Sequence, residues 1–441
     1  MSNEAFDLLV VGAGMAGLTA GAKAASSGKQ VCLLEVGGDV GGSARFAGYA
    51  WTAPTHEVMD AENPLGDEAL KRALVDRFPA GVDWIRSVGI DVDDAQRILS
   101  FGGQGHKFDT NHYIDTCRRI VLDAGGEILL RTEADSLVSV DGVVTGARVR
   151  TGPGESREIS AAYTLLATGG FQGDKELLAQ HVHPDAGKMQ LRSNPNSSGA
   201  GYRLAMAAGA GAGPDNVGFY GHLIPSGVQL ADPADFVDMS LYYSEHALLF
   251  NLDGKRFVDE TLGDHLTTMA LLDQPESRGL LIADARVHRD WMLASYVEGA
   301  VALDKFELAG KRGGRVGMAE ELEELEYLPE EWGYDGAAIA AAIAGFNRAA
   351  ESGQDLTPGR ERDREPLAEG PYYVIETVPA VTFPFHGISI DDQARVLDTA
   401  GVPIPGLLAA GSDTGGLWHE AYAGGIASAL VFGLTAAATA S

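Results

Sequence analysis

Three glycines near the start of the chain have the spacing that phosphate binding requires. Gly12, Gly14 and Gly17 form G-x-G-x-x-G directly after the apolar run 6–11. The first glycine permits a tight turn, the second lets a pyrophosphate approach the backbone, and the third lets a helix pack on a strand. Glu35 follows at about the distance at which an acidic residue binds a ribose. These residues predict a site for the pyrophosphate and ribose of a dinucleotide.

The surrounding residues predict the elements that hold these glycines. Residues 6–11 and 31–34 are apolar runs of strand length, and the small residues 16–25 favour a helix. Strand, glycine turn, helix, strand and acidic residue thus follow in the order of a dinucleotide-binding βαβ unit. In a chain with 57 glycines the pattern alone can arise by chance. The order of the elements favours the binding site over a merely tight turn.

Further motifs follow along the whole chain. They are Gly41-Gly42-Ser43, the run YTLLATGGF at 163–171, the run LLFNLDGKRFVDE at 248–260, and GLLAAGSDTGG with YAGG and VFG in 406–433. Together with the first glycines they resemble the fumarate reductase / 3-ketosteroid dehydrogenase superfamily of flavoproteins, which includes tricarballylate-dehydrogenase-like proteins. The resemblance covers nearly all of the chain and implies FAD as the cofactor.

The resemblance implies an α/β fold with a discontinuous, Rossmann-like FAD-binding domain. Residues 1–218 and 378–441 would form this domain, and an inserted α+β capping domain would span 219–377. The active site is expected between them at the flavin. The FAD contacts that the resemblance implies are Gly12, Gly14, Met15, Ala16, Gly17, Glu35, Val36, Gly41, Gly42, Ser43, Ala44, Ala134, Ala167, Thr168, Gly169, Gly170, Gly411, Asp413, Gly425, Ile426 and Ala427.

Local patterns predict three further elements. Residues 67–89 have apolar residues at helical spacing around an interruption at Pro79, and residues 318–326 also read as a helix. The run 248–260 reads as a hairpin of two strands with its turn at Asp253-Gly254.

The chain departs from fumarate reductases at the positions of their cationic residues. After the run RFVDE, where those enzymes carry an arginine, Asp264 and His265 stand here. In the C-terminal motif Tyr422 holds the place of a second arginine, and His419 lies one residue past the place of a histidine, which Trp418 holds. A dicarboxylate substrate would lose both cationic clamps, so fumarate or succinate is disfavoured.

Tyr422 instead begins Tyr-Ala-Gly-Gly, which resembles the Tyr-x-Gly motif of ketosteroid dehydrogenases. There a tyrosine hydroxyl and a backbone N–H bind the ketone and stabilise the developing enolate. The proton would be handled by Asp264 or His265, and histidine is the better general base near neutral pH. His222 loosely matches a substrate-binding histidine of fumarate reductases, and His419 is expected to line the site. His386 is expected near the flavin.

Composition limits the partners. Lys and Arg number 33 and Asp and Glu 62, so the net charge is −29, which disfavours nucleic acid or an anionic membrane. Two cysteines allow no disulfide framework, and a cytoplasmic location is expected. No apolar run reaches membrane-spanning length, and the start lacks the basic region of a signal peptide. No spacing of His, Cys and acidic residues indicates a metal site.

The sequence therefore predicts an FAD-dependent dehydrogenase or reductase. The resemblance implies hydride transfer between flavin N5 and a CH–CH or C=C bond next to the carbonyl of a small, cyclic ketone or enone. Only one G-x-G-x-x-G follows a strand, so an external electron donor or acceptor is expected. The alternatives are a fumarate-reductase-like enzyme acting on a carboxylate, a flavin oxidase or monooxygenase, and a non-catalytic FAD-binding protein. The oligomeric state stays open.

Overall fold

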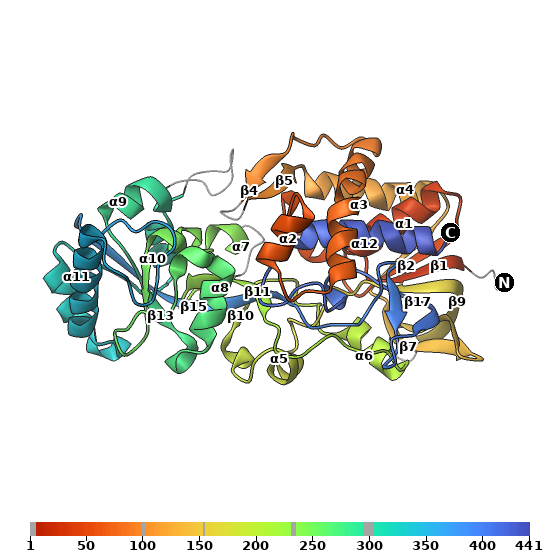
Figure 1. Ribbon diagram of the computed structural model, residues 1–441. Coiled ribbons are helices and arrows are strands. Elements are labelled where there is room, and N and C mark those ends of the chain that lie inside the picture. The colour runs from red at the N-terminus through yellow and green to blue at the C-terminus, as the bar shows by residue number, and fades with distance from the viewer. Residues whose placement is uncertain (1–5, 99–101, 153–154, 231–234, 294–302) are drawn as a thin grey trace. The chain divides into compact units, whose positions relative to one another are not determined.

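The computed structural model describes residues 6–98, 102–152, 155–230, 235–293 and 303–441. The chain divides into two compact units (Figure 1). The first unit contains Met1–His183, Ser193–Phe219 and Phe383–Ser441, and the second contains Pro184–Arg192 and Tyr220–Thr382.

An eight-stranded sheet organises the first unit. The order β16-β17-β9-β1-β2-β6 is parallel except for the pair β16–β17, and β7 and β8 extend from β9 as an antiparallel ribbon. Leu8, Leu9 and Val10 are fully buried, as expected of a central parallel strand covered on both faces. The strands are β1 (Phe6–Val11), β2 (Val31–Glu35), β6 (Glu127–Leu130), β7 (Glu133–Val140), β8 (Val143–Gly152), β9 (Glu155–Leu166), β16 (Arg395–Leu397) and β17 (Pro403–Ala409). A small sheet joins β3 (Tyr49–Thr52), β5 (Gly103–Lys107) and β4 (Gln96–Ile98).

Helices from both ends of the chain pack together in the first unit. Helix α1 packs against α12 and α4, and α12 packs against α3 (Figure 1). A Cβ on Gly433 would lie 2.6 Å from the carbonyl oxygen of Ala16, so this glycine allows α12 to approach α1 closely. The helices are α1 (Met15–Ser26), α2 (His56–Glu62), α3 (Glu68–Ser87), α4 (Thr110–Asp123), α5 (Lys175–His181), α6 (Ala200–Ala207) and α12 (Gly425–Thr439).

The helix expected at 67–89 is confirmed as α3, but the expected interruption at Pro79 is wrong, because α3 runs unbroken from Glu68 to Ser87. A proline inside a helix removes one backbone hydrogen bond and costs about 3 kcal/mol. The helix buries a full apolar face, made of Leu70, Leu74, Phe78, Val82 and Ile85. Burial of several such side chains, at about 1.5–3 kcal/mol each, exceeds that cost.

A six-stranded sheet forms the centre of the second unit, with β15 (Tyr372–Pro384) pairing with four other strands. Alternate residues of its strands enter two cores, since side chains of a strand point to opposite faces in turn. Leu248, Phe250 and Ile282 pack with α11 (Gly336–Ser352), whereas Leu249 and Leu281 belong to the other core. The other strands are β10 (Gln190–Leu191), β11 (Phe219–Pro225), β12 (Leu248–Phe250), β13 (Gly279–Ala283) and β14 (Val316–Ala319), and the other helices are α7 (Asp235–Asp238), α8 (Asp264–Leu272), α9 (Ala285–Val287) and α10 (Lys305–Lys311).

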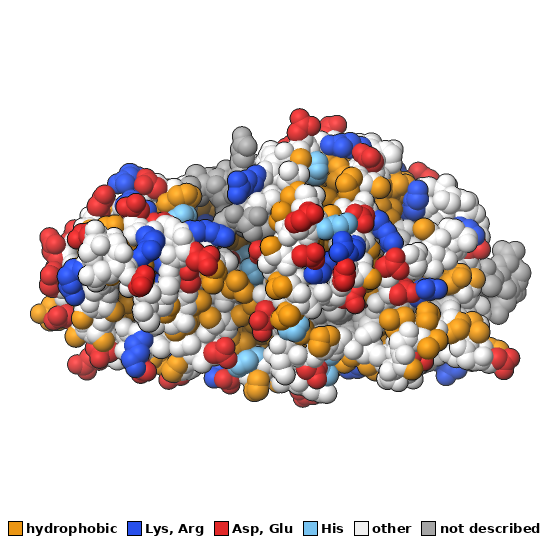
Figure 2. All heavy atoms as spheres, in the orientation of Figure 1, with side chains coloured by type: hydrophobic (Ala, Val, Ile, Leu, Met, Phe, Trp, Pro, Cys, Tyr) orange, Lys and Arg blue, Asp and Glu red, His pale blue; other side chains and the backbone are white. Residues whose placement is uncertain are grey.

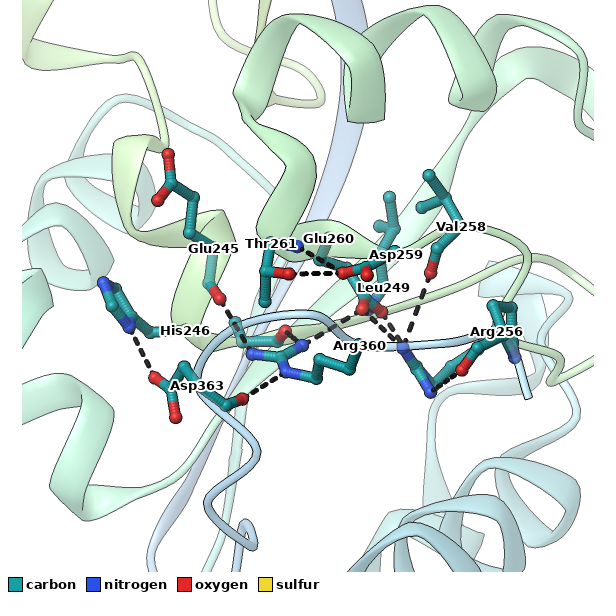
Figure 3. A network of polar contacts seen from close by, with 12 residues as sticks. Glu245, His246, Leu249, Arg256, Val258, Asp259, Glu260, Thr261, Arg360 and Asp363 are labelled. Carbon is teal, nitrogen blue, oxygen red and sulfur yellow. Dashed lines mark hydrogen bonds and ion pairs between the residues drawn. The ribbon is translucent and has the colours of Figure 1, made fainter. Parts of the chain in front are cut away.

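The hairpin expected at 248–260 is reduced to one strand and a single bridge between Phe250 and Arg256. The second half of the run turns inward because Glu260, which is fully buried, binds two arginines (Figure 3). Arg256 Nη2 lies 2.6 Å and Arg360 Nη1 3.0 Å from Glu260 Oε2, while Leu249 N–H donates to Oε1 at 3.0 Å. The run RFVDE is therefore a buried ion-pair anchor of the second unit.

Residues 318–326 do not form the expected α-helix. Met318 and Ala319 lie in β14, which pairs antiparallel with β15, and Leu322–Tyr327 is a 3₁₀ helix. The pairing with β15 satisfies the backbone of this segment, so tertiary structure overrides its local helix propensity.

The surface agrees with a strongly acidic composition. On the face drawn in Figure 2, Asp and Glu side chains are spread over both units with Lys and Arg between them. No helix in the described ranges is both long and apolar enough to cross a bilayer.

Candidate active site

The three glycines of the first turn meet different surroundings. A Cβ on Gly12, whose φ is +104°, would lie 2.2 Å from Ala167 O, and one on Gly17 would lie 2.0 Å from Gly12 O. At Gly14 an added Cβ would meet no atom closer than 3.9 Å beyond its chain neighbours. The backbone at Gly14 therefore faces space beside the N-terminus of α1. This is the cradle that a pyrophosphate needs, and the residues fit FAD.

Glu35 and the second glycine pair join this turn. The side chain of Glu35 accepts hydrogen bonds from Ala13 N–H at 3.0 Å and from Gly37 N–H at 2.7 Å. Each carboxylate oxygen keeps a second lone pair for a ribose hydroxyl. Gly41 N–H donates to Ala13 O at 2.7 Å, so the two glycine turns lie against each other.

Asp413 ties the third glycine turn to the C-terminal segment. Its carboxylate, 1% exposed, accepts from the backbone N–H and the hydroxyl of Thr168 and from Gly170 N–H at 2.8 Å. Burial raises the pKa of Asp413, and these hydrogen bonds oppose the rise. The Asp413 side chain thus joins segments 245 residues apart, and its contact with FAD stays a prediction.

The remaining predicted FAD contacts lie near these turns or at helix starts. Met15 and Ala16 begin α1, and Gly425, Ile426 and Ala427 form the first turn of α12. Val36 follows β2 and is 48% exposed, Gly42 and Ala44 lie in a 3₁₀ turn, and Ala134 is buried in β7. Gly169 and Gly411 have positive φ angles of +93° and +73°. Ser43 Oγ lies 2.8 Å from Ser193 Oγ. The first N–H groups of α1 and α12 have no partner within their own helices.

Tyr422 is buried in an aromatic cluster of the first unit. Its ring centroid lies 5.2 Å from that of Trp51, 5.8 Å from Phe383 and 5.9 Å from Trp418. The hydroxyl oxygen accepts a hydrogen bond from Gly425 N–H at 2.8 Å. The tyrosine hydroxyl and this backbone N–H therefore bond each other, and a role of the two groups in binding a carbonyl stays a prediction.

His419 lies half-buried in the turn that precedes Tyr422. The backbone N–H of His419 donates to Asn63 Oδ1 at 3.2 Å, and Asn63 Nδ2 donates to Leu417 O at 2.6 Å. Asn63, which is fully buried, therefore fixes the backbone of this turn. The catalytic role of the His419 side chain stays a prediction.

The second unit contains a chain of three polar side chains, with a buried histidine between two partly buried groups. His222 Nδ1 bonds the carboxylate of Asp264, and His222 Nε2 lies 2.9 Å from the hydroxyl of Tyr220. Asp264 Oδ1 also accepts from Leu223 N–H at 3.3 Å. The side chain of His222 is 5% exposed and that of Asp264 11%. Hydroxyl, imidazole and carboxylate thus form a continuous path for a proton.

Burial sets the charge states of this chain. It raises the pKa of Asp264 to about 7, opposed by the Leu223 N–H and by Arg192. It lowers the pKa of His222 well below its usual value, and the Arg192 charge adds to this effect. Burial also lowers the pKa of His265, the next residue in α8, to about 4. Near neutral pH both imidazoles are neutral, and Asp264 can gain or lose a proton.

Arg192 is a fixed charge beside this chain and is 8% exposed. It donates to Phe236 O at 2.8 Å, Ser240 Oγ at 3.0 Å and, through its terminal nitrogens, to Thr382 Oγ1 and Tyr242 OH at 3.0 and 3.2 Å. All of these acceptors are neutral. The ring of Tyr242 lies 5.2 Å from that of His222, so a buried guanidinium borders the proton path.

The predicted catalytic residues therefore fall into two sets. His222, Asp264 and His265 lie in the second unit, whereas Tyr422 and His419 lie in the first. Sequence reasoning missed Tyr220 and Arg192. A signal existed for Tyr220, since residues two apart on a strand share a face, and Tyr-x-His in β11 places the two side chains together.

His386 lies in a separate cluster of the first unit with His181, Asp215 and Tyr202. The rings of His181 and His386 stack 4.2 Å apart at 12°, and Asp215 Oδ1 lies 2.7 and 3.2 Å from their Nδ1 atoms. A metal ion binds an imidazole nitrogen in the ring plane, and two parallel rings cannot aim in-plane lone pairs at one point. His386 Nδ1 also donates to Pro214 O at 3.0 Å, so this group reads as a structural hydrogen-bond cluster.

Comparison with known proteins also indicates that this chain binds FAD. The family model described as FAD binding domain matches residues 7–428. A probable fumarate reductase, Ifc3, of Shewanella frigidimarina is 28% identical, over 98% of this chain and 74% of its own length. The vinyl phenol reductase of Lactiplantibacillus plantarum is 26% identical, over 95% of this chain and 92% of its own. A solved 3-ketosteroid Δ1-dehydrogenase from Sterolibacterium denitrificans shares the fold, with a TM-score of 0.80, 17% identity and 99% of each chain covered.

The chain therefore belongs to the FAD-binding-domain family of flavoproteins, whose members here include fumarate reductases and whose fold is shared with ketosteroid dehydrogenases. Its cofactor is FAD. The protein is an FAD-dependent oxidoreductase that acts on CH–CH or C=C bonds.

Proposed function

We propose that this enzyme reduces, or in reverse forms, a C=C bond conjugated to the carbonyl group of a small neutral ketone or enone. The observation that carries the proposal is the hydrogen bond between Gly425 N–H and the hydroxyl of Tyr422. It marks a polar pair inside an otherwise aromatic cluster. The two positions at which fumarate reductases are expected to carry arginine hold Asp264 and Tyr422 instead.

Tyr422 is suited to stabilise charge on a carbonyl oxygen. Accepting a hydrogen bond from Gly425 polarises the hydroxyl and strengthens it as a donor. An oriented donor in a dry site stabilises an enolate oxygen, and removing one such donor typically slows a reaction by about 10²–10³. The rings of Trp51, Phe383 and Trp418 pack around the Tyr422 ring, and Tyr422 is 6% exposed, which favours a dry setting for this hydroxyl.

The His222–Asp264 pair is suited to move the proton. In reduction, a proton must join the α carbon as the C=C bond is lost, and in oxidation the same proton must leave. Asp264, with a pKa of about 7, holds a proton part of the time near neutral pH, as a general acid–base requires. His265, His419 and Tyr422 complete the residues that we assign to the reaction. Bound FAD supplies the hydride chemistry at the β carbon, and an external partner supplies or removes electrons.

A carboxylate substrate is the second candidate, and Arg192 favours it. A buried guanidinium whose hydrogen-bond acceptors among the described residues are neutral can bind an anion, and Arg is well suited to bind carboxylates. The probable fumarate reductase of S. frigidimarina is a relative whose name states such a substrate. Turnover with oxygen as acceptor would instead indicate an oxidase or monooxygenase.

The test is an anaerobic screen of the dithionite-reduced holoenzyme. Cyclic enones, acyclic enones and unsaturated carboxylates are each mixed with it, and flavin reoxidation is followed by absorbance. We expect enones to reoxidise the flavin fastest and Tyr422→Phe to slow this step. If only the unsaturated carboxylates reoxidise the flavin, and Arg192→Gln abolishes that reaction, the substrate is a carboxylic acid and not a ketone. Reoxidation by none of the compounds would support a role in binding rather than turnover.

A further inference from the structure

We propose that Arg131 binds the adenine of FAD by stacking its guanidinium group on the base, and that a strained backbone at this residue places it there. The inference goes beyond the proposed function, because it concerns the adenosine end of the cofactor and holds for any substrate. Its basis is the place of Arg131 beside Glu35, the residue expected to bind the adenosine ribose.

Arg131 lies in the short connection between β6 and β7, next to the loop that follows Glu35. Its backbone N–H donates to Gly37 O at 3.0 Å, and Thr132 N–H donates to Glu35 O at 2.9 Å. These bonds continue the pairing of β2 with β6 past the ends of both strands. Gly37 N–H in turn donates to the Glu35 carboxylate at 2.7 Å. The residue that pairs with Arg131 therefore also holds the acidic group of the cradle.

The guanidinium group of Arg131 has one side covered and the rest open. A Cβ on Gly38 would lie 3.2 Å from Nη2 and 3.7 Å from Cζ, so this side of the group lies against the backbone of the loop. Arg131 is exposed, and within the described ranges its guanidinium forms no hydrogen bond or ion pair. A planar cation without a carboxylate partner is available to stack on the face of a base.

Val36 supplies an apolar side chain at the same place. It directly follows Glu35 and is 48% exposed. If the parallel register that pairs Glu35 with Leu130 is continued by one residue, Val36 stands opposite Arg131. Adenine is flat and uncharged, so a valine side chain and a guanidinium plane both suit its faces. The two residues flank the position expected for the ribose, which is where the base must follow.

The backbone at Arg131 indicates that its side chain is needed here. Its φ is +51°, a conformation that glycine adopts freely and that a residue with a Cβ adopts only at a cost. A glycine would serve the turn better, and the guanidinium bonds no described residue that would repay the cost. Strain of this kind persists at sites where a side chain binds a ligand. The ligand within reach of this connection is the adenosine half of FAD.

The test measures apoprotein stability and FAD affinity in the same variants. Arg131→Gly removes the strain and the guanidinium together. Its apoprotein should unfold at a higher urea concentration than wild type, yet bind FAD about 5–30-fold more weakly. Asp141→Gly is the matched control, since Asp141 has a φ of +52° in the exposed turn between β7 and β8. This control should keep the FAD affinity of the wild type.

Two further variants separate stacking from charge. Arg131→Gln should lose the same affinity as Arg131→Gly, and Arg131→Lys should recover only a small part of it, because an ammonium group is compact and strongly hydrated. Arg157→Gln removes the same charge at an exposed arginine of β9 and should bind FAD like the wild type. An equal loss of affinity in Arg157→Gln would assign the effect to net charge and overturn the contact.

The remaining outcomes also decide the assignment. Wild-type FAD affinity in Arg131→Gln would overturn it, and full recovery in Arg131→Lys would exclude stacking. An Arg131→Gly apoprotein that is less stable than wild type would show that the arginine serves the fold. The bound flavin should keep its absorbance spectrum and midpoint potential in Arg131→Gln, because the change lies at the adenosine end. A shifted potential would place Arg131 at the isoalloxazine ring and overturn the inference.

Discussion

The glycines of the first turn allow a sharp test of the FAD cradle, because two of them respond oppositely to the same added methyl group. Gly14 has φ −82° and ψ −165°, which any residue adopts, and a Cβ there meets nothing within 3.9 Å beyond its chain neighbours. Gly14→Ala should therefore leave the stability of the apoprotein within about 1 kcal/mol of wild type. The methyl group would fill the space into which the pyrophosphate must come.

Gly17→Ala, in contrast, should lower the stability of the apoprotein. Its Cβ would lie 2.0 Å from Gly12 O and 3.0 Å from Val10 Cγ1, inside the contact between α1 and β1. Overpacking of this kind costs about 1–3 kcal/mol. The clash must move α1 away from the strand, since both nearest groups belong to fixed backbone or to the buried core.

The assay compares apoprotein stability with FAD affinity. Urea unfolding of the apoproteins gives the first quantity, and quenching of FAD fluorescence gives the second. We expect Gly14→Ala to unfold like wild type but to bind FAD at least about tenfold more weakly, which is about 1.4 kcal/mol. Wild-type FAD affinity in Gly14→Ala would refute the cradle at this position. Wild-type stability in Gly17→Ala would refute the close packing.

Three further changes test other parts of the structure. Glu260→Gln leaves two buried arginines without their counter-charge and should lower the unfolding free energy, measured in urea, by about 3–5 kcal/mol. The control Asp253→Asn, at an exposed ion pair, should change it by less than about 0.5 kcal/mol. Tyr422→Phe should lower kcat on carbonyl substrates about 10²–10³-fold while flavin content stays at the wild-type level. His265 has a folded pKa of about 4, below its unfolded value, so the unfolded chain binds the extra proton. The unfolding free energy should therefore fall between pH 6.5 and 4 by up to about 1.4 kcal/mol per pH unit, and a pH series with His265→Asn should lack this part of the fall.

The sequence by itself determined the cofactor-binding half of this protein. Strand, glycine turn, helix and acidic residue are local features, and close contacts with neighbouring backbone require two glycines of the turn, Gly12 and Gly17. Predictions from local patterns are wrong where a residue distant in the sequence forms the deciding contact. At 248–260, for example, Glu260 is held inside by Arg360, which lies 100 residues later in the chain.

Only the tertiary structure decided the proton-handling chemistry. The sequence points to Asp264 and His265 only through their place after the run RFVDE. It does not show that Asp264 bonds His222, which lies 42 residues earlier in the chain. Nor could it show that burial reverses the usual order of acidity, lowering the pKa of the histidines and raising that of Asp264 to about 7. Such shifts depend on desolvation and on charges brought close by folding, and neither is written in the spacing of residues along the chain.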